Sequence, residues 1–173
     1  YFLKAIKETN DIEENNYFEI VGSYRRQAKS SGDIDIIITN RKNEKKVFNK
    51  FLDILIRDKI LIEILSRGLT KSLTIAKLSS EDIARRLDFL YSPPDEYAFS
   101  ILYFTGSKDF NTAMRLYSLK QDLTLSEHGF HKFDNKSKKK LEKIQDIFLT
   151  EKDIFDYLNL VYKEPIDRID ENS

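Results

Sequence analysis

Two aspartates, Asp33 and Asp35, stand one residue apart in the apolar run "DIDIIIT". The β-branched, nearly continuous apolar character predicts a central strand, so the two carboxylates share one face, about 6–7 Å apart at their Cα atoms. Ionised carboxylates this close are costly when partly buried unless a cation neutralises them. Magnesium prefers oxygen ligands and is commonly held by one or two carboxylates with substrate phosphates. The pair predicts a magnesium site, and the apolar run argues against the alternative of a solvated edge strand.

A third aspartate falls on another predicted strand, "ARRLDFLY". Alternation places Arg86 and Asp88 on one face and Leu87 and Phe89 on the other. Asp88 completes an acidic cluster if the two strands are neighbours in one sheet. Three carboxylates can hold two Mg²⁺ ions roughly 3.5–4 Å apart, the spacing that stabilises the attacking and leaving oxygens of a phosphoryl transfer.

The segment between the strand "YFEIV" and Asp33 has features of a phosphate-binding loop. Backbone N–H groups at Gly22-Ser23, at a turn into a short helix, can cradle phosphate oxygens. Arg26 adds a positive fork, and Ser31-Gly32 lets the backbone approach a ligand closely. A tight turn with surface arginines is the alternative for any one of these features. Together with "DID" at this spacing they are specific.

The elements that must position these residues follow from periodicity. Residues 2–8 read as a helix, "DIEENN" as a polar turn, and "ILIEIL" and "LTIAKL" as two strands joined by a glycine-containing turn. A helix within "NEKKVFNKFLDILIRD" packs on one sheet face. Its expected apolar stripe is Val47, Phe48, Phe51, Leu52, Leu55 and Ile56. The prolines of "SPPDE" predict a domain boundary.

After this boundary the pattern becomes mostly helical. A short apolar helix spans "EYAFSILYF", and Ser107 caps a second over "KDFNTAMRLYSLK". Phe110, Met114 and Tyr117 are predicted to be buried, whereas Asn111 and Arg115, at i and i+4, share a different face. For these two, an ordinary solvated face is the default interpretation of the spacing alone.

The last third of the chain has fewer chemical signals. "LTL" and "GFHKF" predict two paired strands, and Thr150 with Asp153 predicts a capping box that opens a final helix. "NKSKKK" is either a solvated charged loop or a contact for DNA phosphates. His128 and His131 lack a third nitrogen or sulfur ligand, so we expect surface or hydrogen-bonded histidines rather than a metal site.

Composition limits the class of protein. Lys plus Arg and Asp plus Glu number 29 each, so no global field favours nucleic acid or membranes, and any phosphate binding must be local. The absence of cysteine excludes disulfides, thiolate zinc sites and a cysteine nucleophile. No run is apolar enough for a membrane span, which predicts a soluble chain. Because the chain begins with Tyr1, we expect a piece of a longer protein or a minimal form.

The combined motifs resemble those of the family X DNA polymerases, the group that includes polymerase beta. The resemblance rests on "GSYRRQAKSSGDID", "RRLD", "LYFTGSKDFNTAMR" and "EKDIFDYLNLVYKEPIDR", and covers the chain from Gly22 to Arg168. It implies a mixed α/β fold of the α+β kind: a nucleotidyltransferase palm with a mixed β-sheet and flanking helices over residues 1–94, then a small, mainly helical, nucleotide-binding thumb subdomain over residues 95–173.

The resemblance implies roles for individual residues. Asp33, Asp35 and Asp88 would be catalytic metal ligands, with Asp88 near the primer 3′-hydroxyl and Arg86 tuning it electrostatically. The remaining positions would bind the nucleotide. They are Gly22, Ser23, Arg26, Ser31 and Gly32 at the phosphates, Tyr103, Phe104 and Gly106 at the sugar, Lys108 beside them, and Asn111 and Arg115 at the minor-groove side of the nascent base pair.

Two further features come with the resemblance. The peptide bond between Gly106 and Ser107 is expected to be cis. Arg168 is expected to anchor the terminus with Tyr162 and Pro165, near template phosphates. The sequence departs from the family pattern at Lys108, where polymerase beta-like members can carry an acidic residue. Too few residues precede Gly22 for the lyase and helix-hairpin-helix domains of longer relatives.

The resulting functional hypothesis is a DNA-directed DNA polymerase that fills short gaps in DNA repair, including base excision repair. Its expected cofactors are two Mg²⁺ ions, with Mn²⁺ able to substitute. Its expected partners are gapped or primer-template DNA and dNTP, with no membrane, and the chain is expected to act as a monomer inside a cell, whether nuclear, cytoplasmic or viral. The alternatives are template-independent nucleotidyl transfer and a DNA-binding module with a decayed active site.

Overall fold

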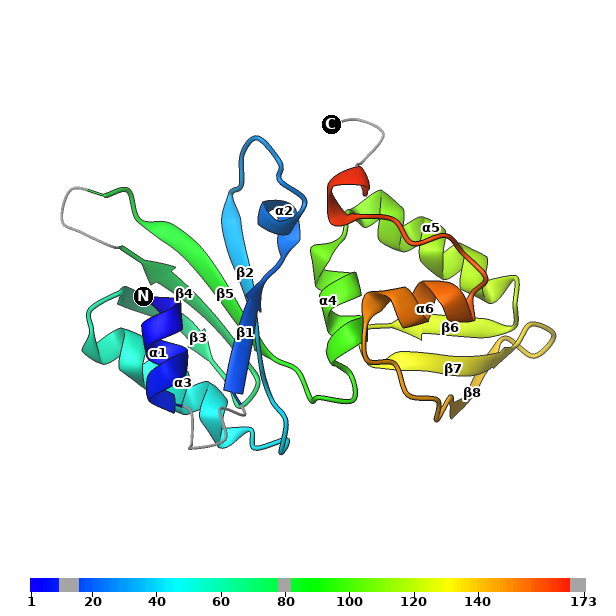
Figure 1. Ribbon diagram of the computed structural model, residues 1–173, viewed down its shortest axis with the longest axis horizontal. Coiled ribbons are helices and arrows are strands. Elements are labelled where there is room, and N and C mark those ends of the chain that lie inside the picture. Colours follow the sequence, from blue (N-terminus) through cyan, green and yellow to red (C-terminus); the bar gives the residue numbers. More distant parts are fainter. Residues whose placement is uncertain (10–15, 78–81, 169–173) are drawn as a thin grey trace. The chain divides into compact units, whose positions relative to one another are not determined.

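The computed structural model describes residues 1–9, 16–77 and 82–168. Most of the turn predicted over "DIEENN" lies outside these residues. The chain forms two compact units (Figure 1). The first contains Tyr1–Tyr24 and Ser30–Pro94, and the second contains Arg25–Lys29 and the chain from Asp95 onward.

The first unit is built on a mixed five-stranded sheet. Its strands are β1 (Asn16–Ile20), β2 (Asp33–Asn40), β3 (Leu61–Arg67), β4 (Lys71–Ala76) and β5 (Arg85–Tyr91), in the spatial order β1-β2-β5-β4-β3. Only β2 and β5 run parallel; the other three pairs are antiparallel. β2 therefore has a partner on each side, as its apolar sequence predicts, and the mixed sheet of the predicted fold class is confirmed.

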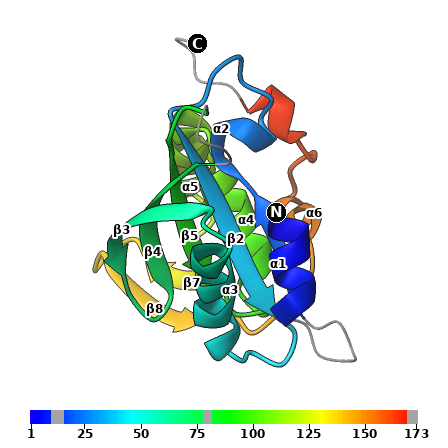
Figure 2. The same ribbon diagram turned by 90° about the vertical axis from the view of Figure 1, so that its left-hand side faces the viewer.

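Two helices, α1 (Phe2–Thr9) and α3 (Lys46–Arg57), lie side by side over one face of this sheet (Figures 1 and 2). Phe51 of α3 and Phe89 of the sheet are both buried in this core. Their rings meet edge to face, with centroids 5.9 Å apart. One detail of the predicted stripe is wrong, because Ile56 is 36% exposed and Ile54 is buried instead. At 3.6 residues per turn, Ile54 lies closer to the centre of the buried face.

The second unit combines helices with a small antiparallel sheet. Its elements are α4 (Tyr97–Thr105), α5 (Lys108–Leu119), β6 (Leu123–Ser126), β7 (Gly129–Asp134), β8 (Lys139–Lys143), α6 (Glu151–Tyr157) and the 3-10 turn η1 (Pro165–Asp167). The sheet order is β6-β7-β8. Both predicted caps are present: Ser107 accepts a hydrogen bond from the Phe110 amide, and Thr150 and Asp153 form a reciprocal capping box.

Two predictions for this unit need correction. Tyr117 is 36% exposed, because Ser118, which follows Met114 at i+4, takes the buried position. The lysine-rich segment is also not a simple loop, since its second half forms β8. The turn before β8 is stabilised by Asp134, which accepts hydrogen bonds from the Lys136 amide and the Ser137 hydroxyl. The backbone can thus pair while the lysine side chains stay in water.

Among the described residues, we find no helix with the length and apolarity that crossing a membrane requires.

Candidate active site

The parallel pairing of β2 with β5 brings the acidic residues of the first unit together. In this register Asp35 lies opposite Asp88, and Asp33 lies opposite Arg86. The residues between them alternate to the other face, where Leu87 and Phe89 belong to the hydrophobic core. The adjacency on which the three-aspartate hypothesis depends is therefore present, although these strands are far apart in the sequence.

The charges in this cluster are not balanced by protein groups alone. Burial, and after it the carboxylates of Asp33 and Asp88, raise the pKa of Asp35 to about 6, and the opposite charges of Arg86 and Lys71 compensate only in part. A raised carboxyl pKa reports that the ionised form is disfavoured where it stands. The site therefore has a surplus of negative charge that a cation would relieve.

Arg86 binds the Asp88 carboxylate in a bidentate arrangement. Its Nε and Nη2 atoms donate hydrogen bonds to the two carboxylate oxygens at 2.8 and 2.7 Å, and this contact raises the pKa of Arg86. The two side chains therefore form a charge-assisted, bidentate pair, and an influence of Arg86 on Asp88 in the reaction stays a prediction.

Whether this site suits a divalent metal depends on the atoms that it offers as metal ligands. Across the parts of the chain that the structure describes, no three acidic, histidine or cysteine side chains are already gathered tightly enough to hold a metal ion. Both oxygens of Asp88 face Arg86, but a carboxylate oxygen keeps a further lone pair for a metal. The donor set is purely carboxylate and in surplus of negative charge, which suits a hard cation such as Mg²⁺.

Gly22 lies directly against the Asp35 carboxylate. It begins the short helix α2 (Gly22–Arg25) with a φ of +66°, and a Cβ atom placed there would lie 2.5 Å from the Asp35 Oδ2 atom. The preceding amide, that of Val21, donates to the Asp35 carbonyl oxygen at 2.8 Å. Glycine is therefore required here both by its backbone conformation and by the close approach of the aspartate.

The two serines of the predicted phosphate loop contact each other. The hydroxyls of Ser23 and Ser31 are 2.7 Å apart, and Ser31 donates to the Asp33 carbonyl oxygen. Gly32 is exposed, and, its two chain neighbours aside, a Cβ atom there would have none of the described residues within 4 Å. Nothing in the described chain requires glycine at position 32, so its backbone is open to an incoming group.

The other predicted nucleotide-binding residues belong to the second unit. Arg26 donates from Nη1 to the Thr105 carbonyl oxygen at 2.6 Å. Gly106, with a φ of +66°, comes directly after, and its peptide bond to Ser107 is cis, as the resemblance implies. Lys108 is exposed at the first position of α5.

Tyr103 is contacted by both Asn111 and Arg115, the residues predicted to lie beside the nascent base pair. Asn111 donates from Nδ2 to the Tyr103 carbonyl oxygen at 2.7 Å. The Arg115 guanidinium carbon lies 4.9 Å from the centre of the Tyr103 ring, and the Phe104 ring packs edge-on against the same ring at 5.0 Å. The predicted shared face of Asn111 and Arg115 is confirmed, and it is a contact surface rather than a purely solvated one.

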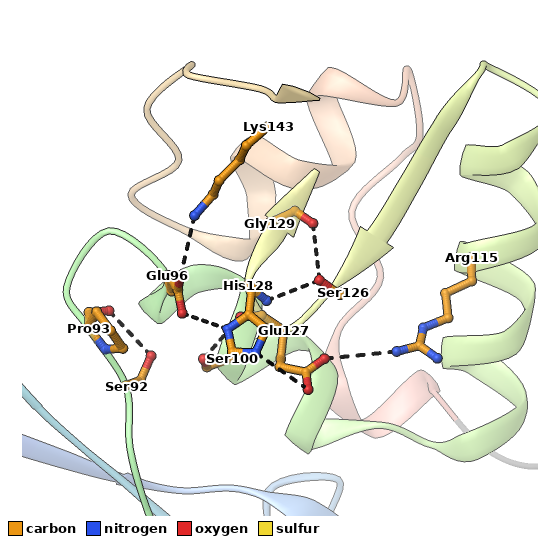
Figure 3. Close-up of polar contacts among 10 residues, drawn as sticks. All are labelled: Ser92, Pro93, Glu96, Ser100, Arg115, Ser126, Glu127, His128, Gly129 and Lys143. Atoms are coloured by element: carbon orange, nitrogen blue, oxygen red, sulfur yellow. Dashed lines mark hydrogen bonds and ion pairs between the residues drawn. The ribbon is translucent and has the colours of Figure 1, made fainter. Parts of the chain in front are cut away.

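A chain of charged side chains extends from Arg115 across the β6–β7 turn (Figure 3). The Arg115 Nη2 atom lies 4.0 Å from a Glu127 oxygen. The neighbouring His128 contacts Glu96 through Nδ1 at 2.8 Å, and Lys143 reaches the other Glu96 oxygen at 3.4 Å. His128 is thus a hydrogen-bonded surface histidine, as expected.

Two family models match this chain almost end to end. Residues 3–94 match the DNA polymerase beta palm, and residues 100–169 match the DNA polymerase beta thumb. The chain belongs to the family X, polymerase beta-like, DNA polymerases. The suspected membership is therefore confirmed.

Curated relatives agree with this family X assignment. A DNA polymerase lambda from Rattus norvegicus is 32% identical over 158 residues, covering 85% of this chain and 28% of that protein. A DNA polymerase lambda from Arabidopsis thaliana is 26% identical over 85% of this chain and 31% of its own length. A DNA nucleotidylexotransferase from Xenopus laevis is 26% identical over 86% of this chain and 36% of its own length. The family X chain thus spans about a third of these relatives.

Sequence reasoning missed Arg25 and Glu151 of this family X chain. In the second unit Arg25 donates from Nη1 to the Thr105 hydroxyl at 2.8 Å and from Nη2 to Glu151 at 2.7 Å. Glu151 also accepts from Arg168 at 2.6 Å. Nothing in the local sequence indicates which of the adjacent residues Arg25 and Arg26 binds an acidic partner. Glu151 is equally inconspicuous, because an acidic residue is common in the first turn of a helix.

Arg168 is an anchor and not a template contact. Its side chain is fully buried, and its guanidinium carbon lies 5.2 to 5.6 Å from the ring centres of Phe110, Phe155 and Tyr162. The expected anchoring of the terminus is confirmed, whereas the expected position near template phosphates is wrong, because a side chain with no exposed surface cannot reach them.

Proposed function

We propose that this chain is the polymerising part of a template-directed DNA polymerase, which adds deoxynucleotides to a primer 3′-hydroxyl by two-metal phosphoryl transfer. The proposal rests above all on the parallel register that sets Asp35 opposite Asp88, with Asp33 and Arg86 as the adjacent pair. This arrangement concentrates carboxylates on one face, and burial together with the charges of Asp33 and Asp88 raises the pKa of Asp35. Membership of the family supports the same chemistry.

The three aspartates would hold two Mg²⁺ ions, with Mn²⁺ as a substitute. Bound metal would offset the charge of the triphosphate and of the attacking and leaving oxygens. Asp88 would lie near the primer 3′-hydroxyl and help to take its proton. Arg86, which already donates two hydrogen bonds to Asp88, would keep that carboxylate oriented.

The remaining site residues would bind the nucleotide. Gly22, Ser23, Ser31, the Gly32 amide and Arg26 would hold the triphosphate, and exposed Lys108 would add positive charge to it. Tyr103, Phe104 and Gly106 would border the sugar, and Asn111 and Arg115 would reach the minor-groove side of the base pair. In this assignment residues 1–94 are the palm and residues 95–173 the nucleotide-binding thumb. The gap-filling role in DNA repair, including base excision repair, and action as a monomer belong to this proposal.

One experiment tests the proposal directly. Primer extension on a duplex with a one-nucleotide gap should proceed with Mg²⁺, stop with EDTA, and favour the nucleotide complementary to each of the four template bases. In this proposal the protein positions the substrates and stabilises the developing charge, and it does so with bound metal and a paired template base. The reaction should therefore depend on both metal and template. A chain that gives no extension under any of these conditions would contradict the proposal and favour a decayed DNA-binding module.

A second candidate is template-independent nucleotidyl transfer, which the similarity to a DNA nucleotidylexotransferase favours. The proposed minor-groove role of Asn111 and Arg115 favours the templated reaction, because residues that read a base pair serve no purpose without one. Comparing incorporation on a gapped duplex with incorporation on a single strand separates the two. Equal rates on both substrates would favour the template-independent reaction.

Glu127 should position Arg115. The replacement Glu127→Gln removes the charge 4.0 Å from the Arg115 guanidinium but leaves the stacking on Tyr103. Because exposed ion pairs contribute up to ~1 kcal/mol, kcat/KM for the matched nucleotide should fall by up to about fivefold. Steady-state kinetics of incorporation on the gapped duplex measure this fall in kcat/KM. Glu63→Gln, an exposed change in β3, should have no effect, and equal values for the two variants would contradict the positioning role.

A further inference from the structure

The hairpin formed by β7 and β8 carries an unbalanced group of lysines. Lys136 and Lys138 lie in the turn, and Lys139 and Lys140 begin β8; we call these four residues the lysine hairpin. All four are exposed, and the ion pairs of this hairpin among the described residues involve Lys132 and Lys143 instead. Within the described residues β8 pairs with β7 alone, so it is an edge strand, and its Lys139 and Lys140 side chains face water.

The contrast with neighbouring lysines is informative. In the same hairpin, Lys132 pairs with Glu142 at 2.8 Å, and Lys143 reaches Glu96 at 3.4 Å. The acidic residue closest in sequence, Asp134, accepts hydrogen bonds from the turn itself. The whole chain is neutral, with 29 basic and 29 acidic residues, so this positive group is a local feature and not a consequence of composition.

The positive field is felt by a neighbouring group. Burial, and then the charges of Lys140, Lys143 and His128, lower the pKa of His131 in β7. The His131 Nδ1 atom is also buried and has no hydrogen-bond partner among the residues that the structure describes. The pKa of His131 is therefore sensitive to the positive charge of the neighbouring lysines.

Protection of the sheet edge does not account for all four lysines. Lysine on an edge strand prevents pairing with other chains, which would suffice for Lys139 and Lys140. Lys136 and Lys138, however, precede the strand, where no edge needs protection. Four like charges that have no ion-pair partner in the described part of the chain are better explained by an anionic ligand that spans both the turn and the strand.

We propose that the lysine hairpin binds the phosphate backbone of duplex DNA, as a sequence-independent contact of the second unit in addition to the candidate active site. The choice of DNA over other polyanions rests on the proposed function, which requires a duplex substrate. Lysine ammonium groups attract phosphate as point charges and release counterions. The contact would hold the protein on its substrate without reading sequence or taking part in phosphoryl transfer.

The test compares two variants that each lose four positive charges. The first replaces Lys136, Lys138, Lys139 and Lys140 with glutamine, and the control replaces the exposed lysines Lys7, Lys45, Lys50 and Lys59. Binding to a blunt duplex is followed by fluorescence anisotropy over a salt series, with EDTA and without nucleotide. The lysine-hairpin variant should bind at least about tenfold more weakly near 0.1 M salt, with a log–log salt slope shallower by roughly 3–4. Equal loss in both variants, or no loss, would overturn the proposal.

A second measurement locates the contact and excludes a general charge effect. In the wild-type chain, DNA should raise the pKa of His131 in an NMR titration, because phosphates would offset the nearby ammonium charges. In the lysine-hairpin variant the DNA-dependent rise should disappear, and circular dichroism should show that the fold is retained. A wild-type His131 pKa that does not respond to bound DNA would contradict the assignment.

Two further outcomes separate this inference from its alternatives. Lysine-dependent binding to phosphatidylserine vesicles, with DNA binding unaffected, would assign the surface to membranes and overturn the choice of DNA. The anisotropy assay needs neither metal nor catalysis, so a chain that fails in primer extension can still pass it. Conversely, an active polymerase whose salt slope is unchanged in the variant would leave the proposed function standing and refute only the lysine-hairpin contact.

Discussion

Replacing Asp35 with asparagine should reduce single-nucleotide incorporation on a gapped duplex by at least ~10³-fold. The amide has nearly the shape of the carboxylate but loses the charge that would hold two cations, and metal-assisted charge stabilisation is worth several kcal/mol. Asp35 lies at the centre of the cluster, opposite Asp88 and two residues from Asp33. Incorporation rates at saturating Mg²⁺ and nucleotide measure the effect.

The same substitution should stabilise the metal-free fold. Because the pKa of Asp35 is raised from 3.8 to about 6 in the folded chain, ionising this carboxyl opposes folding. The opposition is absent below pH 3.8, grows as the pH rises toward 6, and is complete above it. In EDTA at neutral pH, Asp35→Asn should raise the free energy of unfolding by about 1–2 kcal/mol after allowance for solvent screening. The gain should vanish in acid.

These opposite effects distinguish a functional charge from a structural one. The control Asp146→Asn changes an exposed aspartate and should alter neither activity nor stability. An Asp35→Asn chain that incorporates nucleotides at the wild-type rate would refute the metal assignment. A variant that is less stable than wild type at neutral pH in EDTA would refute the conclusion that burial and the neighbouring carboxylates disfavour ionised Asp35 in the folded chain.

Replacing Glu151 with alanine should lower the free energy of unfolding by about 3–5 kcal/mol, the largest stability effect that we expect. Glu151 is 6% exposed and accepts hydrogen bonds from both Arg25 and Arg168. Its removal leaves the guanidinium of the fully buried Arg168 without a counter-charge, and aromatic rings compensate only in part. Urea unfolding, followed by circular dichroism, measures the change.

The same helix provides a matched control. Asp156 in α6 pairs with Lys152 at i,i+4 on the exposed face, so Asp156→Ala should change the unfolding free energy by at most about 0.5 kcal/mol. Glu151→Gln keeps an oxygen that can accept a hydrogen bond. Its loss of unfolding free energy should therefore lie between those of Glu151→Ala and Asp156→Ala. Equal small losses for Glu151→Ala and Asp156→Ala would show that the buried arginine does not depend on this carboxylate.

Local spacing alone determined several features of this protein. The alternation of a strand places Asp33 with Asp35, and Arg86 with Asp88, on common faces wherever those strands lie. Ser107 and the Thr150–Asp153 pair act within one helical turn, and their caps are present. These predictions succeed because the interacting groups are close in sequence, so the period of the backbone fixes their geometry.

Only the tertiary structure decided which of these pieces meet. The parallel pairing of β2 with β5 sets Asp35 opposite Asp88, which neither strand specifies by itself. In the second unit, the tertiary packing selects Arg25 over Arg26 as the partner of Glu151, and buries Arg168 among aromatic rings instead of leaving it for a ligand. Strand register and buried ion pairs depend on how distant segments fill one core, and that packing has no local period to read in the sequence.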